Sequence, residues 1–159
     1  MFLNKRKAIF LISVFTLIFI LIINQVKSQT IKIVDGDTIH LNAEKIRFTG
    51  IDTPELKQVC LKKGVINLCG VKAKQILIDK IGNNFVECIS EGKDQYKRTL
   101  AECFVNNESL SSYLVRSGYA FAYRKYSKKF IEDENYAKTN QLGMWSMKFE
   151  YPWDYRKNR

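Results

Sequence analysis

The sequence contains very little histidine: His40 is the only one among its 159 residues. Its four cysteines include no pair at the two-residue spacing of a zinc knuckle. Both absences argue against a structural zinc site, which is built from cysteine and histidine ligands at short spacings. No internal repeat or low-complexity linker interrupts the chain. A chain of 159 residues is long enough for one domain with a hydrophobic core and short for two domains.

The first 28 residues lack acidic side chains and contain a long uncharged run. Three basic residues, 5–7, precede sixteen residues without a charge, 8–23. A basic start followed by an apolar run is typical of an export signal, although this run is long for a signal peptide and slightly short for a membrane span. We expect residues 1–28 to be a signal peptide or an N-terminal membrane anchor. The protein is then exported, either periplasmic or secreted, or attached to the inner membrane through residues 8–23.

The remainder of the chain is basic. Residues 1–28 hold four of the 26 basic residues and none of the 16 acidic ones, which leaves a formal charge of +6 on residues 29–159. A basic exported domain indicates a polyanionic partner, either nucleic acid or an anionic lipid or wall polymer. Charge alone does not choose among these partners.

All four cysteines, Cys60, Cys69, Cys88 and Cys103, lie in the part expected to be exported. An even number of cysteines in an oxidising compartment favours two disulfides, for which three pairings exist. Cys60 and Cys69 flank a loop rich in lysine and glycine, whereas Cys88 and Cys103 occupy two similar strand-like runs. We therefore favour the pairs 60–69 and 88–103 over a zinc site or four reduced thiols.

Hydrophobic periodicity predicts an α+β domain. Alternating residues predict strands at 30–34, 38–41 and 45–50, and apolar runs predict two more at 83–90 and 99–106. Helical spacing and glycine stop signals predict helices at 69–82, 106–118 and 127–143. Residues 56–68 are predicted to form a polar, lysine-rich loop. Five strands with one helix after the third, followed by two helices, fit a five-stranded OB-fold β-barrel with three packed helices. This domain covers residues 29–150, and residues 151–159 form a basic C-terminal tail.

The predicted helices each have candidate core residues on one face. These are Val71, Ile76, Leu77 and Ile81 in the first helix, Leu110, Tyr113 and Leu114 in the second, and Phe130, Ile131, Tyr136 and Ala137 in the third.

Four carboxylates lie close together between residues 35 and 55: Asp35, Asp37, Asp52 and Glu55, with Arg47 among them. Each has an ordinary interpretation as a turn residue or strand end. However, Asp37 opens one predicted strand and Asp52 closes the next, so an antiparallel pair can bring both to one end of the barrel. Two such charges about 4 Å apart repel by roughly 4 kcal/mol at an effective dielectric of about 20. All-oxygen ligands then indicate a hard cation, calcium or magnesium.

Four motifs in this order resemble the staphylococcal nuclease (thermonuclease) family: VDGDT at 34–38, IRFTGIDTPE at 46–55, YKRTLA at 96–101 and GMWS at 143–146. The resemblance covers residues 30–146. It implies an OB-fold, calcium-dependent phosphodiesterase that cleaves DNA and RNA and leaves 3′-phosphate ends. We also expect the protein to be a monomer.

The resemblance implies a role for particular residues. Asp37, Asp52 and the carbonyl of Thr53 would hold calcium, and Glu55 would act as general base on a metal-held water. Two arginines, Arg47 and Arg98, would bind the scissile phosphate, for which the guanidinium fork is suited. Two tyrosines, Tyr123 and Tyr126, are candidates for stacking on nucleotides. Lys97 and Thr99 replace the glycines that flank the loop arginine in the family.

Two classes of function remain after this comparison. The favoured one is the nuclease, because all six residues expected at its centre are present. The alternative is a non-catalytic exported OB-fold module that binds nucleic acid. A weaker third hypothesis is an envelope protein whose basic surface binds anionic lipid or wall polymer.

Overall fold

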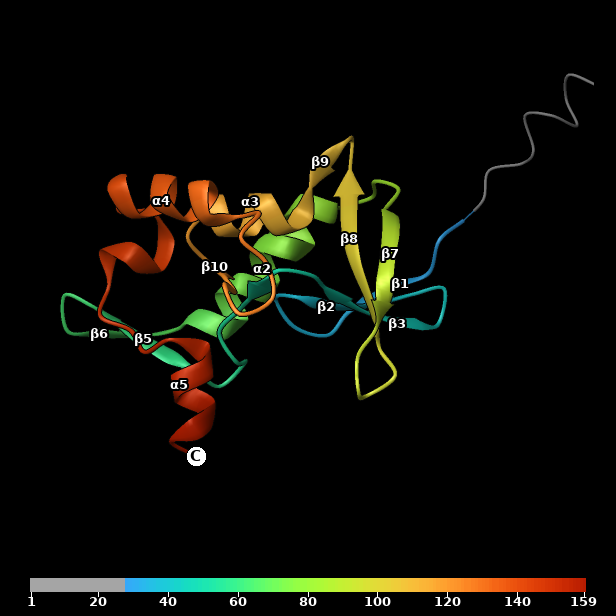
Figure 1. The fold of residues 1–159 in the computed structure, drawn as a ribbon. Coiled ribbons are helices and arrows are strands. Elements are labelled where there is room, and N and C mark those ends of the chain that lie inside the picture. The colour runs from blue at the N-terminus through green and yellow to red at the C-terminus, as the bar shows by residue number, and fades with distance from the viewer. Residues whose placement is uncertain (1–27) are drawn as a thin grey trace, which may run out of the picture.

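The computed structural model describes residues 28–159 (Figure 1). Its main sheet contains, in spatial order, β1 (Ile31–Ile33), β2 (Thr38–Leu41), β3 (Glu44–Phe48), β8 (Thr99–Val105) and β7 (Glu87–Lys93), and the short β9 (Glu108–Ser109) pairs with β8. All neighbours are antiparallel except β3 and β8, which are parallel. Together with the packed helices, this sheet confirms the expected α+β, OB-fold class.

The two ends of this strand order are linked by a side chain. The Gln29 amide donates to the carbonyl of Val86 (2.7 Å) and accepts from its N–H (2.8 Å). Gln29 precedes β1 and Val86 precedes β7. This pair of hydrogen bonds therefore holds the start of β1 beside the start of β7, the two strands at opposite ends of the spatial order.

Two small strand pairs lie outside the main sheet. β4 (Ile51–Asp52) pairs with β10 (Phe121–Ala122), and β5 (Val59–Lys62) pairs with β6 (Val65–Leu68). The prediction of a loop over residues 56–68 was therefore wrong. Lys63 and Gly64 both have positive φ, at 52° and 83°, which suits the tight turn of a two-residue hairpin. The hairpin is hard to recognise in the sequence because its strands are short, Lys62 and Lys63 lie at its turn, and most of its apolar side chains are exposed.

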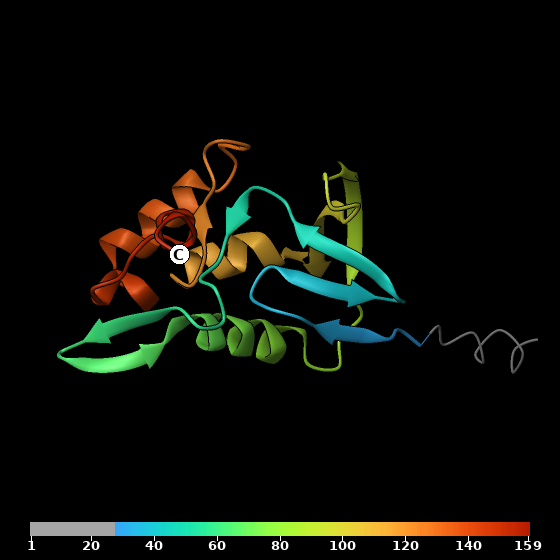
Figure 2. The same ribbon diagram turned by 90° about the horizontal axis from the view of Figure 1, so that it is seen from below.

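Four helices are present in the described residues: α2 (Cys69–Ile81), α3 (Leu110–Arg116), α4 (Ile131–Thr139) and α5 (Pro152–Lys157), with a short 3₁₀ turn, η1 (Gly143–Ser146), between the last two. α2 ends at Gly82, and the Ser109 hydroxyl caps α3 by accepting from the N–H of Ser112 at 3.2 Å. The first three helices confirm the predicted ones. α5 forms within the nine residues for which the sequence predicts only a basic tail. It extends from the body below β5 in Figure 1 and is seen end-on in Figure 2.

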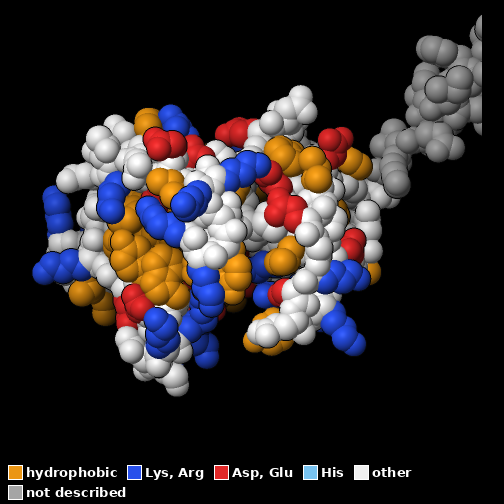
Figure 3. Space-filling model, viewed as in Figure 1, with side chains coloured by type: hydrophobic (Ala, Val, Ile, Leu, Met, Phe, Trp, Pro, Cys, Tyr) orange, Lys and Arg blue, Asp and Glu red, His pale blue; other side chains and the backbone are white. Residues whose placement is uncertain are grey.

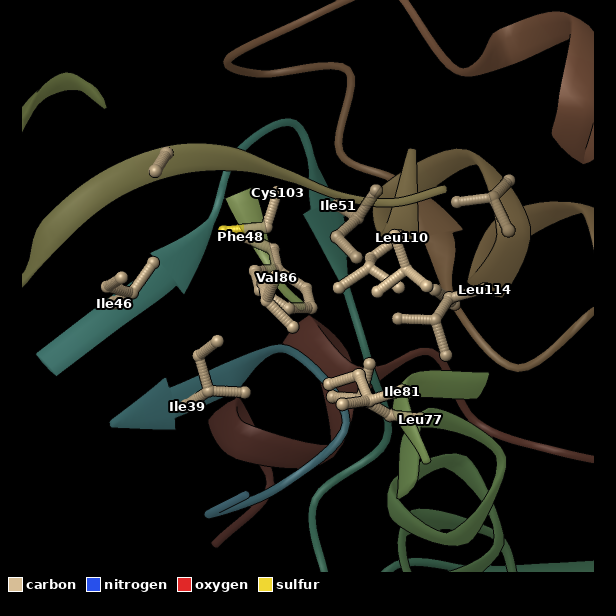
Figure 4. Packing of buried hydrophobic residues seen from close by; sticks show 14 of the residues in the cluster. Ile39, Ile46, Phe48, Ile51, Leu77, Ile81, Val86, Cys103, Leu110 and Leu114 are labelled. Carbon is tan, nitrogen blue, oxygen red and sulfur yellow. The ribbon is translucent and has the colours of Figure 1, made fainter. Parts of the chain in front are cut away.

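The hydrophobic core lies between the sheet and helices α2 and α3 (Figure 4). Sheet residues such as Ile39, Phe48 and Cys103 meet Leu77 of α2 and Leu114 of α3, and all five are buried. Val71 and Tyr136, expected in the core, are 47% and 42% exposed. The buried face of α2 instead consists of Cys69, Gly70, Ala73, Leu77 and Ile81. Steps of mostly four residues define this face, and residue 71 lies off it.

Both disulfides that the sequence favours are present. Cys88 and Cys103 stand directly opposite each other in the β7–β8 register. Cys60 of β5 is joined to Cys69, the first residue of α2. The second bond fastens the β5–β6 hairpin to the helix that follows it.

Within residues 28–159, none of the helices has the length and apolar character needed to cross a membrane. The predicted signal or anchor segment, including its apolar run at 8–23, falls outside the described residues.

Replacing a core residue of α2 tests this packing. Leu77→Ala should lower the free energy of unfolding by about 2–5 kcal/mol, because Leu77 is fully buried and its removal leaves a cavity. Ile78→Ala is the control. The Ile78 side chain, next to Leu77 in sequence, is 37% exposed, so its removal should lower the free energy of unfolding much less. Urea unfolding of both variants measures the difference. Equal losses would contradict the assigned helix face.

Candidate functional site

The two central aspartates lie on either side of one arginine. Arg47 of β3 forms an ion pair through Nη1 with Asp37 Oδ1, and Nη2 lies 2.9 Å from Asp52 Oδ1. The register of β2 and β3 places Thr38 opposite Arg47, which brings Asp37 beside it, and Asp52 ends β4. The carboxylates therefore meet across a guanidinium, which offsets the repulsion expected from the sequence.

Both aspartates are buried. Asp37 is 1% exposed, and its Oδ2 accepts from the Thr53 N–H at 3.0 Å and from the Thr53 hydroxyl at 2.8 Å. Burial raises the pKa of Asp37, although Arg47 opposes this effect. Burial acts to lower the pKa of Arg47, but Asp37 and Asp52 outweigh it and raise that pKa. Thr53 thus contacts Asp37 directly, as part of the same buried cluster.

A residue that the sequence analysis missed completes this cluster. Arg156 of α5 donates from Nη2 to Asp52 Oδ2 at 2.7 Å, and from Nη1 to Asp52 Oδ1 at 3.2 Å and to Glu55 Oε1 at 2.8 Å. Burial acts to lower the pKa of Arg156, but the hydrogen bonds to both carboxylates raise it. More than 100 residues separate Arg156 from these partners, so local pattern could not reveal the contact. The only available signal was Pro152, which suits the first turn of a helix.

The segment that carries Arg156 is attached to β5 and to the β4–β5 connection by backbone and side-chain hydrogen bonds. Lys148 and Leu61 exchange two backbone hydrogen bonds of 2.9 Å. The fully buried Gln58 accepts from the N–H of Glu55 at 3.2 Å and donates to the carbonyl of Glu150 at 2.6 Å. Gln58 therefore connects the backbone of a candidate catalytic residue to the chain that leads into α5.

Aromatic rings hold the same segment from the other side. Tyr151 stacks on Trp153 with centroids 4.6 Å apart, and the buried Phe121 of β10 packs edge-on against both. On the face shown in Figure 3, hydrophobic side chains gather between α4 and the β5–β6 hairpin, with lysine and arginine around them. α5 is thus docked by a second small core.

This docking affects the two candidate stacking tyrosines. Tyr123 is partly buried, and its ring stacks on Trp153 with centroids 5.7 Å apart. Tyr126 meets the edge of Tyr123 and is 70% exposed. Tyr126 therefore presents a free ring, whereas a face of Tyr123 is covered by the C-terminal segment.

Arg98 leads into β8 from the β7–β8 turn, apart from the buried cluster. Its Nε and Nη2 each lie 2.8 Å from Asp94 Oδ2, and Asp94 also accepts from the backbone N–H of Arg98 at 3.0 Å. The parallel register pairs Arg47 with Leu100. Arg98 therefore lies just before the strand that neighbours Arg47, two residues ahead of Leu100.

Glu55 is partly exposed and borders an open pocket of about 430 Å³. The pocket is lined by Asp35, Glu55, Leu56, Lys57, Tyr155, Arg156 and Arg159. Behind Glu55, the chain passes very close to α2: a Cβ on Gly70 would lie 1.9 Å from the carbonyl oxygen of Glu55. Glycine at position 70 therefore lets α2 support the candidate base from behind.

The oxygen atoms of this site are of the type that a hard cation binds. Asp37, Asp52, Glu55 and the Thr53 carbonyl offer only oxygen, which calcium and magnesium prefer. In the described part of the chain, no three histidine, cysteine or acidic side chains are gathered as a metal cluster. Guanidinium groups instead take the oxygens that face the centre of the site.

Comparison with known proteins identifies one family. The protein-family model described as Staphylococcal nuclease homologue matches residues 45–147, well over half of the chain. An uncharacterised endonuclease of Haemophilus influenzae is 30% identical over 125 residues, covering 74% of this chain and 65% of that protein. A protein of Oryza sativa named as a probable staphylococcal-like nuclease is 29% identical over 126 residues, covering 77% of this chain and 31% of the relative. The chain thus spans less than two thirds of either relative.

Enlarging residue 70 tests the support behind Glu55. Gly70→Ala should lower the free energy of unfolding by about 1–3 kcal/mol, because the new Cβ would overlap backbone atoms that cannot rotate away. Val71→Ala, one residue along and 47% exposed, should change it by no more than about 0.5 kcal/mol. Thermal unfolding compares the two variants. A neutral Gly70→Ala would show that this close approach is absent.

The turn before Arg98 provides a second test. Lys97 has φ +63°, a left-handed conformation that glycine adopts without strain. Lys97→Gly should therefore keep or raise the free energy of unfolding, by up to about 1 kcal/mol. Gln95→Gly, in the same turn, should lower it through the greater freedom of the unfolded chain. Urea unfolding measures both variants. An equal decrease in the free energy of unfolding would contradict the claim that Lys97 is strained in its left-handed conformation.

Proposed function

This chain belongs to the staphylococcal nuclease homologue family, and we propose that it is a calcium-dependent endonuclease that hydrolyses DNA and RNA and leaves 3′-phosphate ends. Family membership supports a nuclease acting on nucleic acid. The single observation that carries the finer proposal is the buried cluster of Asp37, Arg47 and Asp52, with Glu55 at its open side.

Asp37, Asp52 and the Thr53 carbonyl are the residues that would hold the calcium ion. When bound, the ion polarises the phosphoryl group and lowers the pKa of a coordinated water. Asp37 and Asp52 place their carboxylate oxygens in surroundings shielded from water, where the attraction between a carboxylate and a cation is stronger. A site with few carboxylates suits the high calcium concentrations found outside cells.

The two arginines act on the phosphate. The side chain of Arg47 is 19% exposed and that of Arg98 is 29% exposed, so both reach solvent. A guanidinium has five N–H donors, and the aspartates engage only part of this set on Arg47. The remaining donors can bind the non-bridging oxygens, where negative charge develops during hydrolysis.

Glu55 is the candidate general base. It is partly exposed at the pocket, and Arg156 holds one of its carboxylate oxygens. The other oxygen is then available to accept a proton from the attacking water. Tyr126, with its exposed ring, is the better placed of the two tyrosines for stacking on a base.

We place this enzyme outside the cytoplasm, as a monomer. The proposal is supported by the two disulfides, which persist in oxidising compartments, and by the signal-like pattern of residues 1–28. The same pattern would serve either a cleaved signal or an anchor in the inner membrane.

Two contacts favour the alternative of a non-catalytic nucleic-acid-binding module. Trp153 covers a face of Tyr123, and Arg156 occupies the carboxylates. Such a module would bind nucleic acid through the basic surface without cleaving it.

Hydrolysis of single-stranded DNA by the oxidised protein distinguishes these functions. We expect cleavage with calcium, none with chelator, and a loss on the order of 10³-fold in Arg98→Ala, as for arginines that stabilise phosphoryl transfer. Arg116→Ala is the matched control, since this half-exposed arginine on α3 pairs with Asp133. Binding without cleavage, across calcium concentrations and alkaline pH, would overturn the nuclease and leave the binding module.

A further inference from the structure

We propose that Arg156 lowers the affinity of the site for a divalent cation, because its guanidinium and the cation compete for the same carboxylate oxygens. This inference rests on the proposed function, which assigns the cation to Asp37 and Asp52. It gives the C-terminal helix α5 a part in the active site.

The competition follows from the hydrogen bonds of the carboxylates. Both oxygens of Asp52 accept from Arg156, at 2.7 and 3.2 Å, and an oxygen of Glu55 accepts from the same guanidinium at 2.8 Å. Asp52 is fully buried, so its oxygens have few other directions from which a ligand can approach. A cation that coordinates Asp52 must therefore displace Arg156 or share an oxygen with it.

Sharing is electrostatically unfavourable. A divalent cation on Asp52 Oδ2 would lie within a few ångströms of the positive guanidinium bound to that atom. Repulsion at such a distance is strong in a partly buried site, where the effective dielectric is far below that of water. Removal of the charge at position 156 should therefore favour the bound cation.

Arg156 is the exchangeable one of the two arginines on Asp52. Arg47 belongs to a central strand, and its side chain is 19% exposed, whereas that of Arg156 is 40% exposed. Arg156 also lines the open pocket beside Glu55, so its guanidinium can turn toward water without disturbing the sheet.

Arg156 is delivered to this position by a docked helix. Pro152 and Tyr155 of α5 are buried, Trp153 is stacked between Tyr151 and Tyr123, and Gln58 holds the carbonyl of Glu150. Because the fold already orders this segment, the contact of Arg156 with the carboxylates loses little conformational entropy. The effective concentration of the Arg156 guanidinium at the carboxylates is therefore high, so it competes well with a cation.

Calcium titration without nucleic acid tests the proposal directly. Isothermal calorimetry on the oxidised full chain should show that Arg156→Gln binds calcium about 10-fold more tightly than the unmodified protein. Arg156→Lys should fall between them, since an ammonium keeps the charge but cannot bridge both carboxylates. Circular dichroism and thermal unfolding establish that each variant is folded.

Arg159→Gln is the matched control. It removes the same charge from the same pocket, but the Arg159 guanidinium lies over the Tyr155 ring, 4.1 Å from its centroid. Calcium affinity should change less than about threefold in this variant. If calcium affinity rises equally in Arg156→Gln and Arg159→Gln, the change in net charge alone explains the rise, and the proposal is overturned.

The remaining outcomes separate this inference from the proposed function. Unchanged or weaker calcium binding in Arg156→Gln overturns the inference, while calcium-dependent cleavage by the unmodified protein still supports the nuclease. Absence of calcium binding in every variant overturns both the inference and the calcium dependence. Tighter binding in Arg156→Gln without any cleavage supports the inference and removes the nuclease.

Discussion

The shared guanidinium between Asp37 and Asp52 is the interaction on which the site depends. Two buried carboxylates on one site would repel each other, and burial raises the pKa of Asp37. Arg47 lies between them because the β2–β3 register sets it beside Asp37, and the turn after β3 returns the chain to Asp52. The barrel therefore holds these charged groups together in the fold, at the place where we propose that a cation and a phosphate bind.

The C-terminal segment extends this arrangement. Gln58, the Leu61–Lys148 backbone pair and the aromatic rings around Phe121 attach α5 to the chain that carries Glu55. The Cys60–Cys69 disulfide and the glycine at position 70 hold α2 against the same region. Elements from the middle and the end of the chain therefore support one carboxylate group, so changes far along the sequence can alter the site.

Much of the fold was readable from local pattern. Alternation identified β1, β2 and β3, and the glycine stop at residue 82 marked the end of α2. The hairpin at 59–68 was missed because its strands are only four residues long and meet at Lys62, Lys63 and Gly64, and because most of its apolar side chains are exposed and do not follow one buried face. Val71 was wrongly placed in the core, since a helical spacing does not say which of two neighbouring faces the rest of the protein will cover.

Sequence alone determined which residue types stand close together along the chain: the acidic stretch around Arg47, the arginine in the turn before β8, and the paired cysteines. Their chemistry follows from side-chain type, which is a local property. Only the tertiary structure decided that Arg156 reaches Asp52 and Glu55, and that Trp153 covers Tyr123. The first contacts join residues more than 100 positions apart and the second joins residues 30 apart, so both depend on how the whole chain packs, and no short-range periodicity encodes them.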